Sequence, residues 1–393
     1  MLRVLTLSTL FPDASRPNFG VFVERQTLGL AAHPDVDLRV VAPVGLPPFP
    51  LSRLGPYAPL AALPRQETWK GVELHRPRFA NLPGTGGRWH APLLARALTP
   101  LLARIRRSFA FDVIDAEFFF PDGPAAIALG QRFGVPVSIK ARGADVHHWG
   151  RAPATAGQVL AAGRAADGLL AVSQAMAADM GVLGMPADRI RVHSTGIDRS
   201  RFGTLDRAAA KAQLGIAGPL VVSLGALIPR KGHAIAIDAV AALPGVALWI
   251  AGEGPERARL EAQIAAGPAR DRIRLTGAMP HADLPALLAA ADVMALASSS
   301  EGLANAWVEA LASGTPIVIP DAGGAREVVT RPAAGRIVAR TAPAFSDGIA
   351  ALLAAPPPAA EVRETAARFS WEANRDALYA HLSGLVRNAQ SSG

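Results

Sequence analysis

The chain has 393 residues, and with 50% hydrophobic and 18% charged residues it can form two or three domains with sizeable cores. It has no cysteine, which excludes disulfides and thiolate metal sites and fits a cytoplasmic protein. The formal charge of +8 invites a nucleic-acid partner, but an aromatic content of 6% without interleaved basic and aromatic residues argues against one.

A strand, a loop and a helix open the chain. A strand over Leu2–Ser8 leads through a turn-rich loop, Thr9–Gly20, into a helix over residues 21–32, and a second strand follows at Leu38–Val41. We interpret the first strand as part of the fold rather than as a signal peptide. This order is typical of a doubly wound α/β sheet, whose ligands gather at the carboxyl ends of the strands. We therefore expect the loop that ends at Gly20 to border a site, although no GxGxxG fingerprint surrounds it.

Seven prolines lie within residues 43–64, which argues against a regular helix or a central strand there. We interpret this segment as a surface excursion, and the alternative is a mobile lid or a membrane-touching loop. The pattern then predicts a helix over Ala91–Arg107 that is kinked or broken at Pro100. No segment of the sequence reaches the roughly 18 apolar residues of a membrane span.

Residues 74–111 are rich in arginine and contain no acidic residue. This segment contains no Asp or Glu after Glu73 until Asp112, and it holds Arg76, Arg78, Arg88, Arg96, Arg104, Arg106 and Arg107. Such a face would attract an anionic lipid surface or a lipid-linked diphosphate acceptor. The alternative is ordinary arginine enrichment of a chain that is rich in Gly and Ala.

Polar residues follow the strand predicted over Val135–Lys140. Arg142 and Asp145 lie there on a glycine turn, where this architecture positions its chemistry. Asp145 either accepts hydrogen bonds from a sugar or pairs with Arg142 and holds the loop. The neighbouring His147 and His148 lack the spacing of a zinc motif, so we expect no metal site.

The alternation of strands and helices restarts in the second half, which predicts a second domain of the same type. Its first strand, Leu220–Leu224, leads into a glycine-bounded loop that carries Arg230 and Lys231. Adjacent cations between a strand and a helix are well suited to bind a diphosphate, although a solvated surface pair is the alternative. This loop is not a Walker loop, because GxxxxGK[ST] is absent.

Two carboxylates follow the apolar run Val293–Ala297. Glu301 lies in a polar loop, and Glu309 lies on an amphipathic helix that is expected to begin near Ala304 and to end before Gly314. Free amides at the helix N-terminus suit a phosphate, and carboxylates suit sugar hydroxyls. The alternative is a capping acid and a solvated surface residue.

The phrases GALIPRKG, GEGPE, IRLTG and STGID, together with SSSEGLANAWVEALASGTPIVIP, resemble the retaining glycosyltransferases of family 4. That family has the GT-B fold, in which two Rossmann-like domains face each other across a cleft. The resemblance implies an acceptor-side domain over residues 1–198 and a nucleotide-sugar domain over residues 199–370. A final helix over residues 371–389, capped by Ser370, would cross back to the first domain, and residues 390–393 would be disordered.

The resemblance also implies roles for particular residues. Arg230 and Lys231 would bind the donor diphosphate and stabilise the leaving group, Glu301 would lie beside the donor sugar, and Glu309 would hold the ribose hydroxyls. Further donor-side positions would be Gly20, Gly225, Gly252 and the backbone of Gly302, Leu303, Ala304 and Asn305. Arg142 and Asp145 match the acceptor-side motif, although many members carry a histidine near position 142.

The function expected from the resemblance is retaining, metal-independent transfer of a sugar from a nucleotide-diphosphate sugar, UDP-linked or GDP-linked. The donor is a substrate, so no cofactor is expected. The acceptor would be a lipid-linked or polysaccharide glycan of bacterial envelope synthesis, with peripheral contact at the inner face of the membrane. The alternatives are a phosphorylase or epimerase-like enzyme of the same fold, or a basic protein that binds polyanions.

Overall fold

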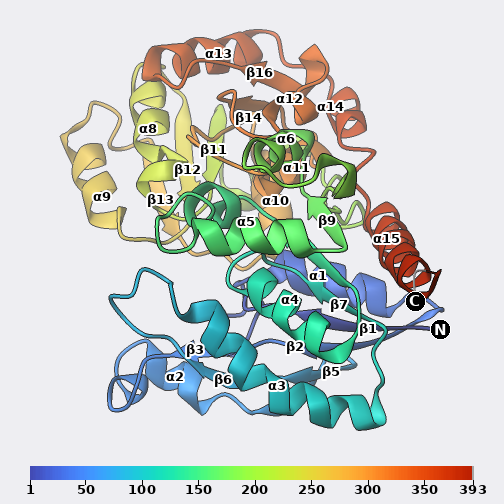
Figure 1. Cartoon of the computed structure of the whole chain (residues 1–393). Helices are drawn as coiled ribbons and strands as arrows, with labels where there is room; N and C mark the ends of the chain where they lie inside the picture. Colours follow the sequence, from blue (N-terminus) through green and yellow to red (C-terminus); the bar gives the residue numbers. More distant parts are fainter. Residues whose placement is uncertain (392–393) are drawn as a thin grey trace. The chain divides into compact units, whose positions relative to one another are not determined.

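The computed structural model describes residues 1–391, and within that range the chain forms two compact units (Figure 1). The first unit contains Met1–Thr195 together with the segment that begins at Trp371, and the second contains Gly196–Ser370. The division between the units therefore falls three residues before the boundary expected at 198. Each unit is built on its own largely parallel sheet, so the prediction of two Rossmann-like domains is confirmed.

The first unit holds, within the described residues, an eight-stranded sheet in the order β10-β9-β8-β7-β1-β2-β5-β4. The pairs are parallel except for β4 with β5. All residues of β7, β8 and β9 are buried, as expected for strands that are covered on both faces. The strands are β1 Leu2–Leu7, β2 Val36–Val41, β4 Gln66–Trp69, β5 Val72–His75, β7 Val113–Ala116, β8 Val137–Ala141, β9 Gly168–Ala171 and β10 Ile190–Val192.

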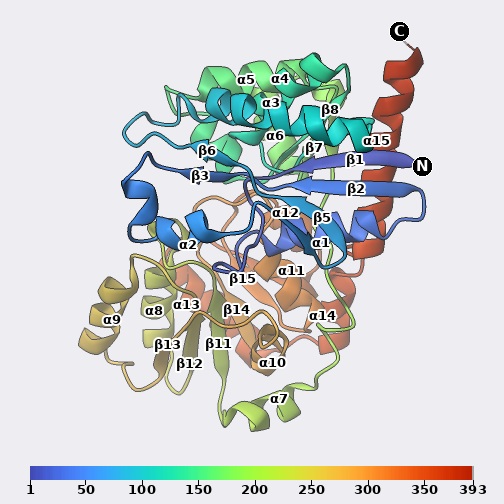
Figure 2. The ribbon, with the colours of Figure 1, turned by 90° about the horizontal axis from the view of Figure 1, so that it is seen from below.

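Helices cover both faces of this sheet (Figure 2). On one face, α1 (Val21–Ala31) packs against α15 (Trp371–Ser391), and buried leucines of both helices join the core formed by β1, β2 and β5. The other face is covered by α3 (His90–Ser108), α4 (Asp122–Phe133) and α5 (Ala156–Ala165). Ser173 caps α6 (Gln174–Val182) by accepting from Met176 N, as predicted.

Three expectations about the first unit differ from the structure in part. Helix α3 runs through Pro100, which removes the break and leaves the kink as the prediction; its buried residues at helical spacing, among them Leu94, Leu98 and Leu102, anchor both halves. Residues 43–64 contain the short helix α2 (Tyr57–Ala62), which was not expected and which tolerates Pro59 in its first turn. They also contain a 3₁₀ turn at Leu51–Arg53 and β3 (Val44–Leu46), which forms a two-stranded sheet with β6 (Arg78–Ala80) and is therefore not a central strand. Gln390 and Ser391 continue α15 instead of being disordered, and residues 392–393 lie outside the described residues.

The second unit has a sheet of parallel strands in the order β13-β12-β11-β14-β15-β16. Its strands are β11 Leu220–Leu224, β12 Ala247–Ala251, β13 Ile273–Gly277, β14 Val293–Ala295, β15 Ile317–Ile319 and β16 Gly335–Ile337. Its helices are α7 Arg207–Leu214, α8 His233–Ala241, α9 Arg257–Ala266, α10 Leu284–Ala290, α11 Asn305–Ala312, α12 Ala325–Val328, α13 Ala342–Ala354 and α14 Ala359–Thr365. Aliphatic residues of β11, β12 and α8 pack with Phe345 and Ile349 of α13 in one core.

Within residues 1–391, no helix has both the length and the apolar character that crossing a membrane requires.

Candidate active site

The predicted donor residues gather where the strand order of the second unit reverses. Strands β12 and β13 lie on one side of β11, and β14 lies on the other, with Val222 paired to Met294. In open α/β sheets, ligands bind in the crevice at this switch point, beyond the carboxyl ends of the strands. The loop with Arg230 and Lys231 follows β11, and the loop with Glu301 follows β14. The fold therefore brings together residues that are 70 positions apart in sequence.

Glu301 forms ion pairs with both cations. Its Oε1 lies 2.5 Å from Lys231 Nζ and 3.2 Å from an Arg230 guanidinium nitrogen, and only 8% of Glu301 is exposed. Burial by itself would raise the pKa of Glu301, but the charges of Lys231 and Arg230 hold that pKa below its ordinary value. The carboxylate is therefore ionised, and the two cations are fixed beside it at the switch point.

Backbone contacts hold these two loops together. Arg230 O accepts from Ser299 N (2.9 Å), and Arg340 Nε donates to Ala297 O (2.7 Å). Gly232, at φ 67°, ends the turn Pro229–Lys231, and a Cβ there would lie 2.2 Å from Ala297 O. The cations therefore lie on a turn that packs directly against the end of β14.

Gly225 and Gly252 join the ends of β11 and β12. Gly225 N donates to Ala251 O (3.0 Å), and a Cβ on Gly252 would lie 1.9 Å from Gly225 O. Close backbone packing explains Gly252, and the positive φ of 148° explains Gly225, in both cases without a ligand. Their contact with a donor stays a prediction.

His233, the first residue of α8, is a buried residue of this site that sequence reasoning missed. Its Nδ1 lies 3.0 Å from Ser223 Oγ, and its Nε2 lies 3.3 Å from Ala226 O. Burial lowers the pKa of His233 to about 4, so the ring is neutral at neutral pH and links β11 to the loop that carries the cations. The sequence signal that could have identified His233 as a site residue is its position directly after the Arg-Lys-Gly turn.

The His233 ring makes stability depend on pH. Its pKa is near 6.5 in the unfolded chain and about 4 in the fold, so between these values the unfolded chain binds more protons and stability falls as pH falls. Relative to a His233→Asn variant, we expect the wild type to lose about 3 kcal/mol between pH 7 and pH 4. Urea unfolding of both proteins across this range measures the difference, and parallel pH profiles would contradict it.

Glu309 projects from α11 and has a partner that the sequence did not predict. Glu309 Oε1 lies 2.9 Å from His281 Nε2, and Glu309 is 8% exposed. The Phe202 ring packs edge-on against the His281 ring at 5.7 Å, and Arg201 donates to His281 O (3.2 Å). The segment after the STGID turn therefore supports the histidine that contacts Glu309.

The segment between the two glutamates forms the amino end of α11. Ala304 precedes the helix, and within the described residues no side chain caps the first amides of α11. Gly302 O accepts from Gly324 N (2.8 Å), and a Cβ on Gly323 would lie 2.0 Å from Glu301 O. The turn after β15 therefore supports the backbone that was predicted to contact the donor.

In the first unit, Asp145 holds its own loop together. It is fully buried, and its carboxylate accepts from the backbone amides of Phe119 (3.0 Å), Arg142 (3.0 Å) and Gly143 (2.7 Å). These contacts favour the loop-holding interpretation over a direct contact with a sugar. Asp145 meets Arg142 through the Arg142 backbone amide, whereas the Arg142 guanidinium pairs with Glu117 and donates to Glu117 O (2.6 Å).

A buried network of polar side chains lies behind Arg142. Lys140 Nζ donates to Gln26 Oε1 (2.5 Å) and to His193 Nδ1 (2.6 Å), and Gln26 donates to Glu117. Burial lowers the pKa of Lys140 to about 7. Sequence reasoning missed this network, although charged residues within the apolar runs of β7 and β8 were a signal.

Gly20 packs closely against the backbone of the loop that it ends. It precedes α1 with φ 68°, and a Cβ there would lie 2.5 Å from Leu10 O. A side chain at this position would push the loop away from the start of the helix. This packing explains the glycine, and its contact with a donor stays a prediction.

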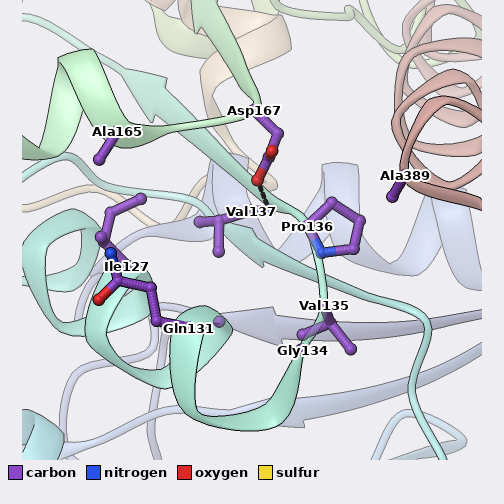
Figure 3. Close-up of a pocket in the computed structure, with 10 residues that line it drawn as sticks. Ile127, Gln131, Gly134, Val135, Pro136, Val137, Ala165, Asp167 and Ala389 are labelled. Carbon is purple, nitrogen blue, oxygen red and sulfur yellow. Dashed lines mark hydrogen bonds between the residues drawn. The ribbon is translucent and has the colours of Figure 1, made fainter. Parts of the chain in front are cut away.

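A cavity of about 310 Å³ lies in the first unit beside the start of β8, at the amino ends of the strands (Figure 3). Its lining includes Gln131, Pro136 and Ala389, and the Asp167 carboxylate there accepts from Val137 N (2.8 Å). Ligands of doubly wound sheets bind at the carboxyl ends of the strands. This cavity is therefore not the candidate site.

Comparison with known proteins covers both units. The Glycosyltransferase Family 4 model matches residues 21–201, and the model of Glycosyl transferases group 1 matches residues 206–369. The putative teichuronic acid biosynthesis glycosyltransferase TuaC of Bacillus subtilis is 28% identical over 337 residues, which cover 82% of each chain. The D-inositol 3-phosphate glycosyltransferase of Segniliparus rotundus is 35% identical over 214 residues, 51% of this chain and 48% of that protein.

Solved structures share the fold of the whole chain. Sucrose-phosphate synthase from Thermosynechococcus elongatus has a TM-score of 0.81 at 21% identity and matches over the full length of both chains. HepE of Anabaena, solved in complex with UDP-glucose, has a TM-score of 0.72 at 20% identity and matches 98% of this chain and 100% of its own. With both halves matched by family models and the fold matched throughout, the chain belongs to the GT-B glycosyltransferases that join a Family 4 half to a group 1 half.

Proposed function

We propose that this glycosyltransferase moves a sugar from a nucleoside-diphosphate sugar to a hydroxyl acceptor, with retention of the anomeric configuration and without a metal ion. The observation that carries the proposal is the cluster of Lys231, Arg230 and ionised Glu301 at the switch point of the second sheet. Fixed cations at this position provide the charge that a leaving diphosphate requires. The only Asp-x-Asp of the sequence, Asp35 and Asp37, lies at the start of β2, away from the carboxyl ends of the strands.

The reaction exchanges one bond of the anomeric carbon for another. The bond from the anomeric carbon to the β-phosphate oxygen breaks, and a bond to the acceptor oxygen forms on the same face of the sugar. The acceptor proton passes to the departing phosphate oxygen. Lys231 and Arg230 stabilise the charge that develops on the diphosphate, and the first amides of α11 contribute further donors.

Glu309 binds the ribose hydroxyls of the donor, and Glu301 lies beside the donor sugar. The contact from His281 fixes one oxygen of the Glu309 carboxylate and leaves its other oxygen for a hydroxyl. A hydroxyl is bound with a defined orientation only when the carboxylate that accepts from it does not rotate. His281 therefore acts as a positioning residue in the binding of the donor.

A His281→Leu variant should raise the KM for the donor about tenfold and leave kcat within about twofold, because a lost hydrogen bond to a charged group weakens binding by about 1.4 kcal/mol. Steady-state kinetics at saturating acceptor measures both constants. A His148→Leu variant, on the short π-helix Asp145–Trp149 of the first unit, serves as the control. Equal loss of kcat in the His281 variant would contradict a role in binding alone.

The donor class is a UDP-sugar or a GDP-sugar, and the acceptor is a lipid-linked or polysaccharide glycan of bacterial envelope synthesis, processed at the cytoplasmic face of the membrane. Support comes from the relative named for teichuronic acid biosynthesis and from the lipopolysaccharide core glycosyltransferase LpsE of Rhizobium meliloti, 40% identical over 129 residues. HepE of Anabaena, a neighbour in fold, was solved with UDP-glucose.

A thermal-shift screen followed by product analysis tests the function. A cognate donor at a hundred times its Kd should stabilise the protein by about 2.7 kcal/mol. Transfer should then proceed in the presence of EDTA, and NMR of the product should give the anomeric configuration of the donor. An inverted product would overturn retention, and activity that requires added Mg²⁺ would overturn the metal-independent mechanism.

A further inference from the structure

Two loops of the first unit leave the same end of the β3–β6 pair. These strands are parallel, with Gly45 paired to Phe79, and Asn81 N donates to Leu46 O (2.8 Å). The chain segments that follow β3 and β6 therefore start side by side. Figures 1 and 2 show both connections projecting on the same side of this unit.

These loops expose large apolar side chains. Among residues 1–391, seven large hydrophobic residues are at least 36% exposed, and four of the seven lie in these two loops: Phe49 at 75%, Leu51 at 50%, Leu54 at 57% and Trp89 at 49%. Isolated apolar residues on a surface are ordinary, but a group of them indicates an interaction site. We refer to these four residues, with Arg53 and Arg88, as the loop surface.

The charge around the loop surface has one sign. Residues 43–66 and 74–111 contain no Asp or Glu. Arg53 and Arg88 are exposed within the two loops, and the Arg53 guanidinium lies 5.7 Å from the centre of the Phe49 ring. Exposed apolar side chains in segments that carry arginines and no acidic residue match the two layers of an anionic bilayer, in which acyl chains lie beneath phosphate headgroups.

We propose that the loop surface docks on an anionic phospholipid bilayer, with Phe49, Leu51 and Leu54 inserted at the boundary between headgroups and acyl chains. Trp89 lies at headgroup depth, where indole rings are enriched, and the arginines contact phosphates. The contact is peripheral, since it uses loop tips rather than a spanning helix. This binding goes beyond sugar transfer and uses none of the residues of the donor site.

Co-sedimentation of the full chain with vesicles tests the docking. The vesicles contain phosphatidylcholine alone or phosphatidylcholine mixed with phosphatidylglycerol. The test variant combines Phe49→Ser, Leu51→Ser and Leu54→Ser, and the control is Val182→Ser, which removes an 85% exposed apolar side chain from α6. A second variant, Arg53→Gln with Arg88→Gln, tests the electrostatic part.

We expect the wild type and Val182→Ser to bind the anionic vesicles, with binding weakened by salt, and the triple serine variant to bind at least about tenfold less. The arginine variant should lose the preference for phosphatidylglycerol. Absence of wild-type binding, or equal binding by the triple variant, would overturn the proposal. So would loss of the donor thermal shift in the triple variant, because the loops would then belong to the donor site. The donor thermal shift of the wild type reports separately on the transferase function.

Discussion

Replacing Lys231 by Ala should reduce sugar transfer at least about a hundredfold, because one of the two fixed cations beside the leaving diphosphate is removed. The loss should fall on kcat as well as on donor binding, since the charge on the diphosphate grows as the bond to the sugar breaks. Steady-state kinetics with saturating donor measures it. Arg230 alone cannot compensate, because its guanidinium also donates to Ser300 O.

The same variant leaves Glu301 buried with one cation fewer, which lowers stability. The double variant Lys231→Ala, Glu301→Gln removes that unpaired charge and should restore the unfolding temperature while transfer stays low. Arg257→Ala, which removes an exposed cation of α9 in the same unit, is the matched control and should keep full activity. Wild-type turnover by Lys231→Ala would refute the assignment of this site.

Replacing Gly252 by Ala should destabilise the second unit by at least about 3 kcal/mol, because the new Cβ would need the space that Gly225 O occupies. A separation of 1.9 Å between these two atoms is far below any van der Waals contact, and both sides are backbone. The ends of β11 and β12 must separate, which also displaces the loop that carries the cations. Loss of the donor thermal shift should therefore accompany a fall of about 6 to 12 °C in the unfolding temperature.

Gly218→Ala is the control for this variant, because a Cβ there would lie 3.7 Å from its nearest neighbour, Gly245 O. It should unfold within about 2 °C of the wild type. Equal unfolding temperatures for Gly252→Ala and Gly218→Ala would show that the strand ends tolerate a methyl group.

Local patterns in the sequence predicted the strands around both sites well. The Leu220–Leu224 strand, the helix from Asn305 and the Ser173 cap all follow from apolar runs, turn residues and capping chemistry within a few positions. The break that was one of two alternatives at Pro100 is absent, because tertiary packing of α3 outweighs a local penalty. Local rules fail where contacts distant in sequence supply the free energy.

The partners of the site residues were not predictable in the same way. His281 reaches Glu309 across 28 residues, and Lys140 reaches Gln26 across 114. The sequence around Asp145 is the same whether its carboxylate is free to bind a sugar or already accepts hydrogen bonds from its own loop. Only the backbone amides that donate to Asp145 in the structure favour the second alternative.

The sequence by itself determined that this chain is a pair of α/β domains with Arg230, Lys231 and Glu301 in loops after strands and Glu309 on the following helix, because periodicity, glycine turns and motif spacing are local properties. Only the tertiary structure decided that Lys231 and Arg230 meet Glu301, that the Arg142 guanidinium pairs with Glu117 while Asp145 accepts from backbone amides, and that large apolar residues are exposed in the two segments that follow β3 and β6. The physical reason is that ion pairing, burial and exposure depend on which strands become neighbours in the sheet. That order is fixed by packing across the whole unit.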